Sequence, residues 1–306
     1  MTRVLVTGAA GVIGTALLPA LMAAGFDVHG FDRTFDPEQE LVSGDALADA
    51  LGGCDAVIHL AACARVAEAE AHPARARRDN VEATATLLRA VSTQSRRPWV
   101  VFASSLEVYG RAAARPVRTI ARSRRSTATE LPRPRPSRSC GERRLTGCAP
   151  TSFGSPTSTA RHPTTQIAWF PPSSPQPWLG GRSSSAARIG RSTSSTSRDA
   201  EAAIISAAEA LTRGDAGAGA INACSGVETT LSALAGRVVT LSASDSVFHA
   251  ADPAPYEVDR FVGDNRAARS ALSWVPRVSL DAGLVKIIHS AARLRHPAVA
   301  VERMLQ

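Results

Sequence analysis

A short apolar strand that runs directly into three spaced glycines is the feature that most constrains this chain. The run is Val4-Leu5-Val6-Thr7-Gly8-Ala9-Ala10-Gly11-Val12-Ile13-Gly14, and a helical pattern follows it. Gly8 permits a tight turn, Gly11 lets the backbone approach a phosphate without a Cβ in the way, and Gly14 lets helix and strand pack closely. Free N–H groups at the start of the helix, around Val12 and Ile13, would then hold an anion such as a pyrophosphate.

An acidic residue at the end of the next strand agrees with a dinucleotide ligand. Asp32 follows the strand-like run from Asp27 to Phe31. A carboxylate about twenty residues beyond the glycines can accept both ribose hydroxyls and repel a 2′-phosphate, which favours NAD. Arg33 comes next and could stack on adenine or meet a phosphate, so NADP stays open as the less favoured cofactor. The other alternative is that the glycines serve a turn in a domain without a cofactor.

Strand-like and helical patterns alternate through the first part of the chain. The predicted strands are Arg3 to Thr7, Asp27 to Phe31, Ala56 to Leu60 and Trp99 to Ala103, and the predicted helices are Thr15 to Ala24 and Val81 to Val91. Short buried strands that alternate with helices are typical of a parallel sheet covered on both faces. The sequence therefore predicts an α/β fold, a doubly wound Rossmann sheet.

The composition changes abruptly in the middle of the chain. From residue 117 to 197 Ser, Thr, Pro and Arg dominate, no period of 2 or 3.6 persists, and Pro132-Arg133-Pro134-Arg135-Pro136 excludes a helix interior or a central strand. We predict an irregular segment, most of it coil. Such a long insert inside a compact domain needs an explanation. Our hypothesis is a shifted reading frame of a GC-rich gene.

Regular patterns return at residue 198. The predicted elements are helices from Asp199 to Leu211, Ser232 to Ala235 and Leu280 to Leu294, and strands from Ala220 to Ala223 and Val238 to Leu241. We therefore divide the chain into an NAD-binding part (1–116), the aberrant segment (117–197) and a C-terminal part (198–306) that completes the core and forms a small substrate domain.

Ordered motifs along the chain resemble those of one enzyme family. They are Thr7 to Gly14, Gly44-Asp45, His59-Leu60-Ala61-Ala62, Asn80-Val81 and Ser104-Ser105-Leu106-Glu107-Val108-Tyr109-Gly110, with C-terminal counterparts around Ile221 to Gly226 and Arg260 to Leu284. This series resembles the extended short-chain dehydrogenases/reductases of the NAD-dependent epimerase/dehydratase type. The likeness covers about 115 residues at the front of the chain and about 90 at the back.

The resemblance implies a role for several residues. Asp45 and Ala46 would hold the adenine ring, Leu60, Ala61 and Ala62 would line the cofactor path, and Asn80 and Ser104 would contact the cofactor. Ser105 would be the catalytic hydroxyl that hydrogen-bonds the substrate oxygen. Two alternatives compete: Asp45 as a turn residue and Asn80 as a helix cap. The expected substrate is a small molecule, a nucleotide sugar, and a homodimer is one expected assembly.

The family chemistry needs a tyrosine and a lysine four residues apart, and this chain has no such pair. The tyrosine acts as general base or acid, and the ammonium lowers its pKa. The chain's tyrosines are Tyr109 and Tyr256, and its one lysine is Lys286. Tyr109 matches the family's substrate-side tyrosine rather than the catalytic one. A second departure is the stretch Pro253-Ala254-Pro255, where nucleotide-sugar enzymes carry an arginine. Activity is therefore in doubt, and the alternative function is a non-catalytic dinucleotide-binding sensor or scaffold.

Bulk properties exclude several other classes. The formal charge of +8 arises in the segment from Arg118 to Arg198, where 14 arginines and two glutamates give +12 and leave −4 for the rest. That segment has few aromatic residues, so we do not expect nucleic-acid binding. Five scattered cysteines form no C-x-x-C pair, which predicts reduced thiols and no metal site. No stretch has the length of a membrane span, so we expect a cytoplasmic protein.

Overall fold

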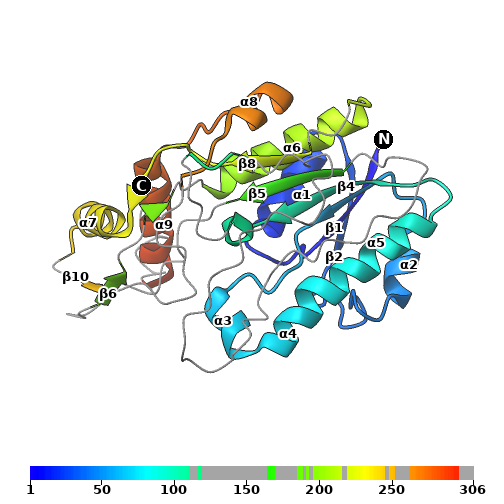
Figure 1. Ribbon diagram of the computed structural model, residues 1–306, viewed down its shortest axis with the longest axis horizontal. Coiled ribbons are helices and arrows are strands. Elements are labelled where there is room, and N and C mark those ends of the chain that lie inside the picture. The colour runs from blue at the N-terminus through cyan, green and yellow to red at the C-terminus, as the bar shows by residue number, and fades with distance from the viewer. Residues whose placement is uncertain are drawn as a thin grey trace, which may run out of the picture. The chain divides into compact units, whose positions relative to one another are not determined.

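The computed structural model describes the chain in separate ranges (Figure 1). The described residues are 1–109, 116–118, 164–169, 185–188, 191–192, 196–215, 219–244, 248–251 and 262–295. They belong to two compact units: residues 1–102 lie in the first, and the described residues from 103 to 118 and from 165 onward lie in the second. The first unit thus ends its N-terminal stretch at Phe102, before the predicted boundary at residue 116.

The first unit is built on parallel strands, as the sequence predicts. They are β1 (Arg3–Thr7), β2 (Asp27–Phe31), β3 (Ala56–His59) and β4 (Trp99–Ser104), arranged β2-β1-β3-β4. Val4 of β1 pairs with Val28 of β2 on one side and with Ala56 of β3 on the other. This parallel sheet with its covering helices confirms the α/β Rossmann-type fold.

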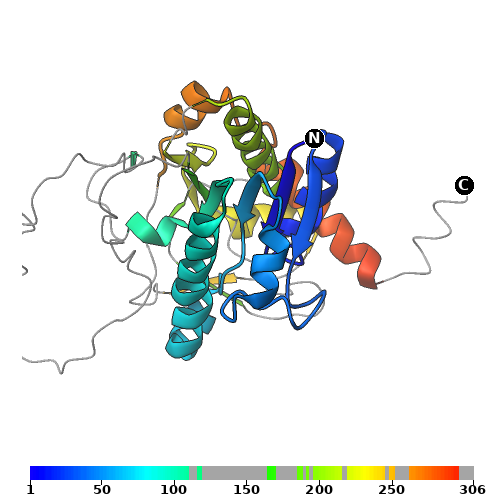
Figure 2. The ribbon, with the colours of Figure 1, turned by 90° about the vertical axis from the view of Figure 1, so that its right-hand side faces the viewer.

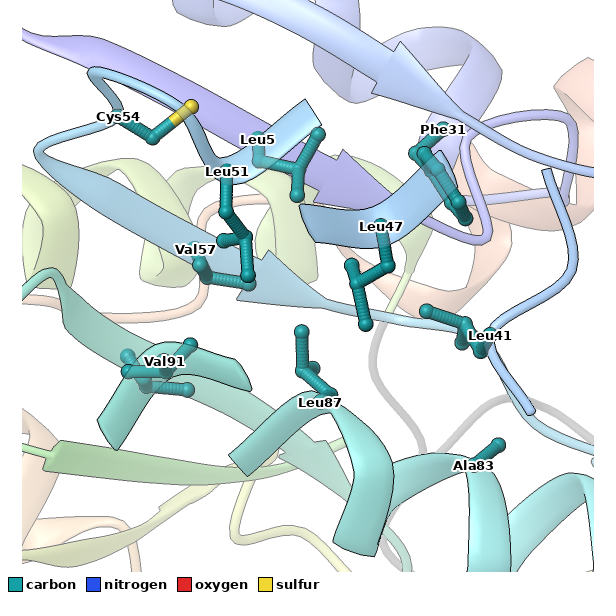
Figure 3. Packing of buried hydrophobic residues seen from close by; sticks show 11 residues of the cluster. Leu5, Phe31, Leu41, Leu47, Leu51, Cys54, Val57, Ala83, Leu87 and Val91 are labelled. Carbon is teal, nitrogen blue, oxygen red and sulfur yellow. The ribbon is translucent and has the colours of Figure 1, made fainter. Parts of the chain in front are cut away.

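Two helices cover one face of these strands (Figure 3). They are α2 (Asp45–Leu51) and α5 (Ala83–Thr93). Their apolar side chains pack on alternate residues of the strands, and the cluster consists of Leu5, Phe31, Leu41, Leu47, Leu51, Cys54, Val57, Ala83, Leu87, Val91 and Val100. Burying a side chain of this size contributes about 1.5–3 kcal/mol, so this cluster is a main source of stability for the unit.

The opposite face is covered by α1 (Gly14–Ala23). Figure 2 shows α1 and α5 on opposite sides of the strands. Leu17 and Leu21 of α1 are fully buried, as are Val4 and Val6. Because successive strand residues point to opposite faces, Val4 and Val6 turn toward α1 while Leu5 turns toward α2 and α5.

A second helical stretch leads into α5. It begins with α3 (Val66–Ala71) and α4 (Pro73–Arg77), and a π-helical turn, η1 (Arg78–Glu82), joins α4 to α5. Pro73 occupies the first position of α4, where its missing N–H costs nothing. The helix that the sequence predicts from Val81 to Val91 is therefore the last part of a longer helical stretch.

A chain of hydrogen bonds crosses the interior of the first unit. The Thr7 hydroxyl lies 2.6 Å from Nδ1 of His59, whose Nε2 lies 3.0 Å from the Thr84 hydroxyl. Thr84 in turn donates to the carbonyl of Asn80 at 2.7 Å. Because Thr84 uses its proton on Asn80, its oxygen accepts from Nε2–H, and Nδ1 is left to accept from Thr7. The neutral imidazole thus joins β1, β3 and the π-helical turn.

The second unit contains shorter elements. They are η2 (Leu106–Tyr109), β5 (Thr164–Trp169), β6 (Ser185–Arg188), β7 (Arg191–Ser192), α6 (Ser197–Thr212), β8 (Ala220–Ala223), β9 (Thr229–Thr230), α7 (Leu231–Ser242), β10 (Phe248–Ala251), α8 (Arg266–Leu272) and α9 (Leu280–Arg295). β5 pairs in parallel with β8 and β6 with β10, whereas β7 and β9 are antiparallel. Among the described residues no helix is long and apolar enough to cross a membrane, and no cluster of metal-binding side chains occurs.

Two predictions of local structure differ from what is observed. The run from Val238 to Leu241, predicted as a strand, lies inside α7. The Thr230 hydroxyl accepts from the Ala233 amide and caps that helix, and this local bond outweighs the strand propensity of the two valines. The segment predicted as coil contains β5, β6 and β7 in its described parts, because strands from elsewhere in the chain supply their backbone partners.

A buried aspartate organises the C-terminal half of the second unit. Asp199, near the start of α6, is 3% exposed. Its Oδ1 accepts from the amides of Arg277 (2.8 Å) and Val278 (3.3 Å), and its Oδ2 accepts from the Thr196 hydroxyl (3.0 Å). Its carbonyl also accepts from the Trp274 indole. Asp199 therefore holds Thr196, the residue that caps α6, and anchors the segment that leads into α9.

We expect Asp199→Ala to lower the free energy of unfolding by about 2 kcal/mol, since the partly buried amides of Arg277 and Val278 lose their acceptor at about 1 kcal/mol each. Asp199→Asn retains an oxygen for those amides and should cost about 1 kcal/mol. Urea unfolding of both variants measures the difference. Equal stability of Asp199→Ala and the parent chain would contradict the anchoring role.

His59 makes the stability of the chain depend on pH. Burial lowers the pKa of His59 to about 4, whereas the unfolded chain has the ordinary 6.5. The unfolded state therefore binds a proton first, and stability falls by about 3 kcal/mol as the pH drops from about 6.5 to 4. Urea unfolding across this range should show the loss in the parent chain and in the exposed control His72→Gln, but not in His59→Gln. A parallel loss in His59→Gln would refute the assignment.

Candidate functional site

The glycine loop turns so tightly that two of its glycines accept no side chain. Gly8 has φ +73°, and a Cβ built on it would lie 2.5 Å from the amide nitrogen of Ala61. A Cβ on Gly14 would lie 2.5 Å from the carbonyl oxygen of Ala9. At Gly11 the nearest atom, the Gly8 carbonyl, is 3.1 Å away. Gly8 and Gly14 are therefore needed for the fold, whereas Gly11 mainly keeps the outer side of the loop bare.

Three amide groups at the start of α1 make no hydrogen bond within the described part of the chain. They belong to Val12, Ile13 and Gly14, whereas the Gly11 amide donates to the Gly8 carbonyl at 3.1 Å. Val12 is 81% exposed and Gly11 is also exposed, so this part of the loop faces solvent. Unpaired N–H groups at the positive end of a helix dipole form an anion site. The loop therefore has the donors that a phosphate needs.

Asp32 lies beside this loop. Its Oδ2 accepts from the Ala10 amide at 3.1 Å, and its Oδ1 accepts from the Thr34 amide at 2.9 Å. Its own amide donates to the Gln39 side chain at 2.8 Å. A carboxylate offers about four acceptor positions, so Asp32 keeps capacity for further donors after these two bonds. The structure thus brings the predicted ribose-binding carboxylate and the glycine loop together.

The next residue, Arg33, is engaged in an ion pair. Its Nη2 lies 3.4 Å from Oδ2 of Asp79, a residue of the π-helical turn. Arg75 reaches the same oxygen with its Nε at 3.6 Å. Two guanidinium groups therefore share one carboxylate near Asp32.

The end of β3 forms the opposite side of the glycine turn. The Leu60 amide donates to the Thr7 carbonyl at 3.0 Å and extends the parallel pairing by one residue. Ala61 is half-buried with its backbone against Gly8, and Ala62 is exposed. Leu60 and Ala61 therefore lie against the glycine turn, and the cofactor path along Leu60, Ala61 and Ala62 stays a prediction.

Asn80 holds the chain beyond Ala62. Its Oδ1 accepts from the Cys63 amide at 2.7 Å, and its Nδ2 donates to the Cys63 carbonyl at 3.2 Å. Asn80 sits inside the π-helical turn, so the alternative of a helix cap is wrong. The pair of hydrogen bonds fixes the loop that follows β3, and the predicted cofactor contact of Asn80 stays a prediction.

The predicted adenine residues begin α2. Asp45 is its first residue, after Gly44 with φ +83°, and the Asp45 side chain lies outside the described set. Ala46 lines a cavity of about 510 Å³ together with Phe31 and Gln39. The lining also includes Arg3, Asp27 and Cys54, and Asp32 is not part of it.

The predicted serines and Tyr109 belong to the region that follows the first unit. Ser104 ends β4, Ser105 comes next, and both are half-buried. The Tyr109 hydroxyl donates to Oδ1 of Asn222 at 2.6 Å, and Asn222 is fully buried. The phenolic O–H of Tyr109 therefore donates a structural hydrogen bond within the second unit. Tyr256 and Pro253-Ala254-Pro255 lie outside the described residues.

Sequence reasoning missed three contributors to the site. They are the His59 to Thr84 hydrogen bond, the Gln39 support of Asp32 and the Asp79 pairing of Arg33. The available signal was a histidine that directly follows the apolar run Ala56 to Ile58, since a polar residue at the end of a buried strand needs a partner. Nothing in the sequence marked Gln39 or Asp79.

Comparison with known proteins agrees with this geometry. Residues 4–146 match the family model "NAD dependent epimerase/dehydratase family". UDP-glucose 4-epimerase 3 of Oryza sativa subsp. japonica is 34% identical over 132 residues, covering 35% of each chain. A 3-beta-hydroxysteroid dehydrogenase of Mycolicibacterium neoaurum is 30% identical over 122 residues, covering 35% of this chain and 33% of that protein. The chain thus matches about a third of the length of these curated relatives.

Solved structures share the fold over nearly the whole chain. UDP-glucose 4-epimerase from Bifidobacterium longum, solved with NAD+ and UDP, has a TM-score of 0.71 at 15% identity and covers 97% of this chain and 99% of its own. RMD from Pseudomonas aeruginosa, solved with NADPH, has a TM-score of 0.65 at 19% identity and covers 96% and 100%. At such identities the likeness establishes the fold. Over residues 4–146, the chain is similar to the NAD-dependent epimerase/dehydratase family.

Proposed function

We propose that the chain binds NAD through its first unit and acts as an epimerase/dehydratase-type oxidoreductase on a nucleotide sugar. The observation that carries the proposal is that hydrogen-bond donors and an acceptor carboxylate lie side by side. Unpaired amides of Val12, Ile13 and Gly14 open α1, and the Asp32 carboxylate lies beside them, bonded to Ala10. Phosphates need the first group, and ribose hydroxyls need the second.

The residues present fit a dinucleotide. Bare backbone at Gly11 gives a pyrophosphate access to the loop, and Asp32 retains acceptor capacity for the adenosine ribose. Leu60, Ala61 and Ala62 would line the cofactor path, with Ser104 and Asn80 farther along it, while Asp45 and Ala46 would hold the adenine. When bound, NAD supplies a hydride acceptor for a sugar carbon. Asp32 favours NAD over NADP, since it would repel a 2′-phosphate.

The proposed substrate class rests on the relatives, and the proposed role of Ser105 rests on the motif from Ser104 to Gly110. UDP-glucose 4-epimerase is the name of one curated relative and of a structural neighbour solved with NAD+ and UDP. A nucleotide sugar is therefore the proposed substrate, and Ser105 is the proposed hydroxyl that hydrogen-bonds the sugar oxygen. A homodimer and a cytoplasmic location are part of the same proposal.

The second candidate function is dinucleotide binding without turnover. It is favoured by the sequence, which has no tyrosine with a lysine four residues later, and by the Tyr109 hydroxyl, which donates to Asn222. A serine hydroxyl alone is a poor general base at neutral pH, because it stays protonated and its neutral oxygen binds a further proton only weakly. In this function the site would act as a sensor or scaffold.

We expect NAD to bind the full chain and Asp32→Ala to weaken that binding by about 10- to 100-fold, because hydrogen bonds to a charged group contribute about 1.5–3 kcal/mol. Asp36→Ala is the matched control: Asp36 is an exposed carboxylate four residues later that caps the Glu38 amide. Isothermal titration with NAD gives both dissociation constants, and thermal unfolding shows that the variants are folded. No measurable affinity of the parent chain for either NAD or NADP would defeat the proposed function.

We expect turnover of UDP-glucose in the presence of NAD to be about 100- to 10,000-fold slower than in an enzyme with a positioned general base. Proton NMR of the sugar signals measures conversion to the 4-epimer over hours. Tight NAD binding with no conversion supports the second candidate. Conversion that disappears in Ser105→Ala supports the first.

A further inference from the structure

A three-membered charge cluster stands beside the proposed ribose position. Asp79 is at its centre, with Nη2 of Arg33 at 3.4 Å and Nε of Arg75 at 3.6 Å from the same oxygen. Arg75 also reaches Oε1 of Glu68 through Nη1 at 3.2 Å. The Asp79 side chain is 10% exposed, whereas Arg33 is 49% exposed. The Asp79 carboxylate is thus largely buried, and the Arg33 guanidinium is the more exposed partner of the pair.

The position of Arg33 matters because it follows Asp32 directly. A basic residue at this point of a dinucleotide site is the group that accommodates a 2′-phosphate. In the structure its guanidinium is held by Asp79, a residue 46 positions later in the chain. A 2′-phosphate would have to draw Arg33 away from that carboxylate and would also meet the negative charges of Asp32 and Asp79.

We propose that Asp79 is a specificity-determining residue that retains Arg33 and thereby disfavours NADP. The inference rests on the proposed dinucleotide function. It adds a residue of the π-helical turn, Asp79, that influences the choice between NAD and NADP. Asp79 acts through Arg33 and does not itself touch the cofactor. Arg75 contacts the same Asp79 oxygen, and Glu68 in turn pairs with Arg75.

The expected size of the effect follows from the exposure of the pair. Half-exposed ion pairs change an equilibrium by a factor of up to about five, and removal of one nearby negative charge adds to the attraction for a phosphate. We therefore expect Asp79→Asn to raise the affinity for NADP relative to NAD by about 3- to 10-fold. The shift should shrink in high salt, because the groups are partly exposed.

The experiment is a titration of the full chain with NAD and with NADP, which gives the ratio of their dissociation constants. Four proteins are compared: the parent, Asp79→Asn, Arg33→Ala and the double variant. If Arg33 mediates the effect, Asp79→Asn shifts the ratio more in the parent background than in the Arg33→Ala background, where only the loss of the Asp79 charge acts. Thermal unfolding of each protein shows that the isosteric change at Asp79 preserves the fold.

Glu82→Gln is the control for a general charge effect. Glu82 lies in the same helical turn and pairs with Arg77 at 3.5 Å, and neither residue contacts Arg33 among the described interactions. We expect the ratio of the NAD and NADP dissociation constants in Glu82→Gln to equal that of the parent chain. An equal shift in Glu82→Gln, an unchanged ratio in Asp79→Asn, or the same shift with and without Arg33 would each overturn the assignment. Absence of any dinucleotide binding by the parent would instead remove the proposed function, and the inference with it.

Discussion

The contact between Gly8 and the backbone of Leu60 and Ala61 is the constraint from which the architecture of the first unit follows. A Cβ at Gly8 would lie 2.5 Å from the Ala61 nitrogen, so the turn after β1 exists because that atom is absent. The turn directs the chain across the end of β3 and into α1, where Gly14 repeats the requirement against Ala9. The unpaired amides at the start of α1 are a consequence of this path, and so is their position next to the end of β2.

Buried polar bonds then fix the segments around the loop relative to one another. Thr7 immediately precedes Gly8, and its hydroxyl is the first member of the chain that passes through His59 to Thr84 and the carbonyl of Asn80. Asn80 returns two hydrogen bonds to Cys63, just beyond Ala62. A neutral, fully paired imidazole suits this interior because every donor meets an acceptor, whereas an imidazolium would face the Thr7 hydroxyl with a second donor. The candidate cofactor wall is thus assembled from three parts of the chain by one hydrogen-bonded series.

The sequence predicted the strands of the first unit well, and the reason is physical. Parallel strands that are buried on both sides appear as short apolar runs, such as Val4 to Val6 and Ala56 to Ile58, and glycines that must lack a Cβ cannot be replaced. The π-helical turn and the Asp79 pairing escaped prediction because both depend on residues that meet in space. The strand prediction for Val238 to Leu241 was wrong. These residues lie in α7, whose N-terminal cap is Thr230, eight residues earlier. For the candidate site, the position of Asp32 was predictable from spacing, while its support by Gln39 depends on how a loop folds back.

The residues proposed for dinucleotide binding and the described tyrosine belong to different parts of this chain. The groups proposed to hold the phosphates and the ribose all lie between Gly8 and Asn80, in a unit with its own apolar cluster and its own polar series. Tyr109, which resembles the substrate-side tyrosine, belongs instead to the second unit. Its hydroxyl donates to Oδ1 of Asn222, and Asn222 itself donates to the carbonyls of Val117 and Asp264. Making Tyr109 a general base would leave the buried Asn222 oxygen without that donor, at a cost of about 1–3 kcal/mol. The chain can therefore retain a dinucleotide site while its one described tyrosine remains a structural residue.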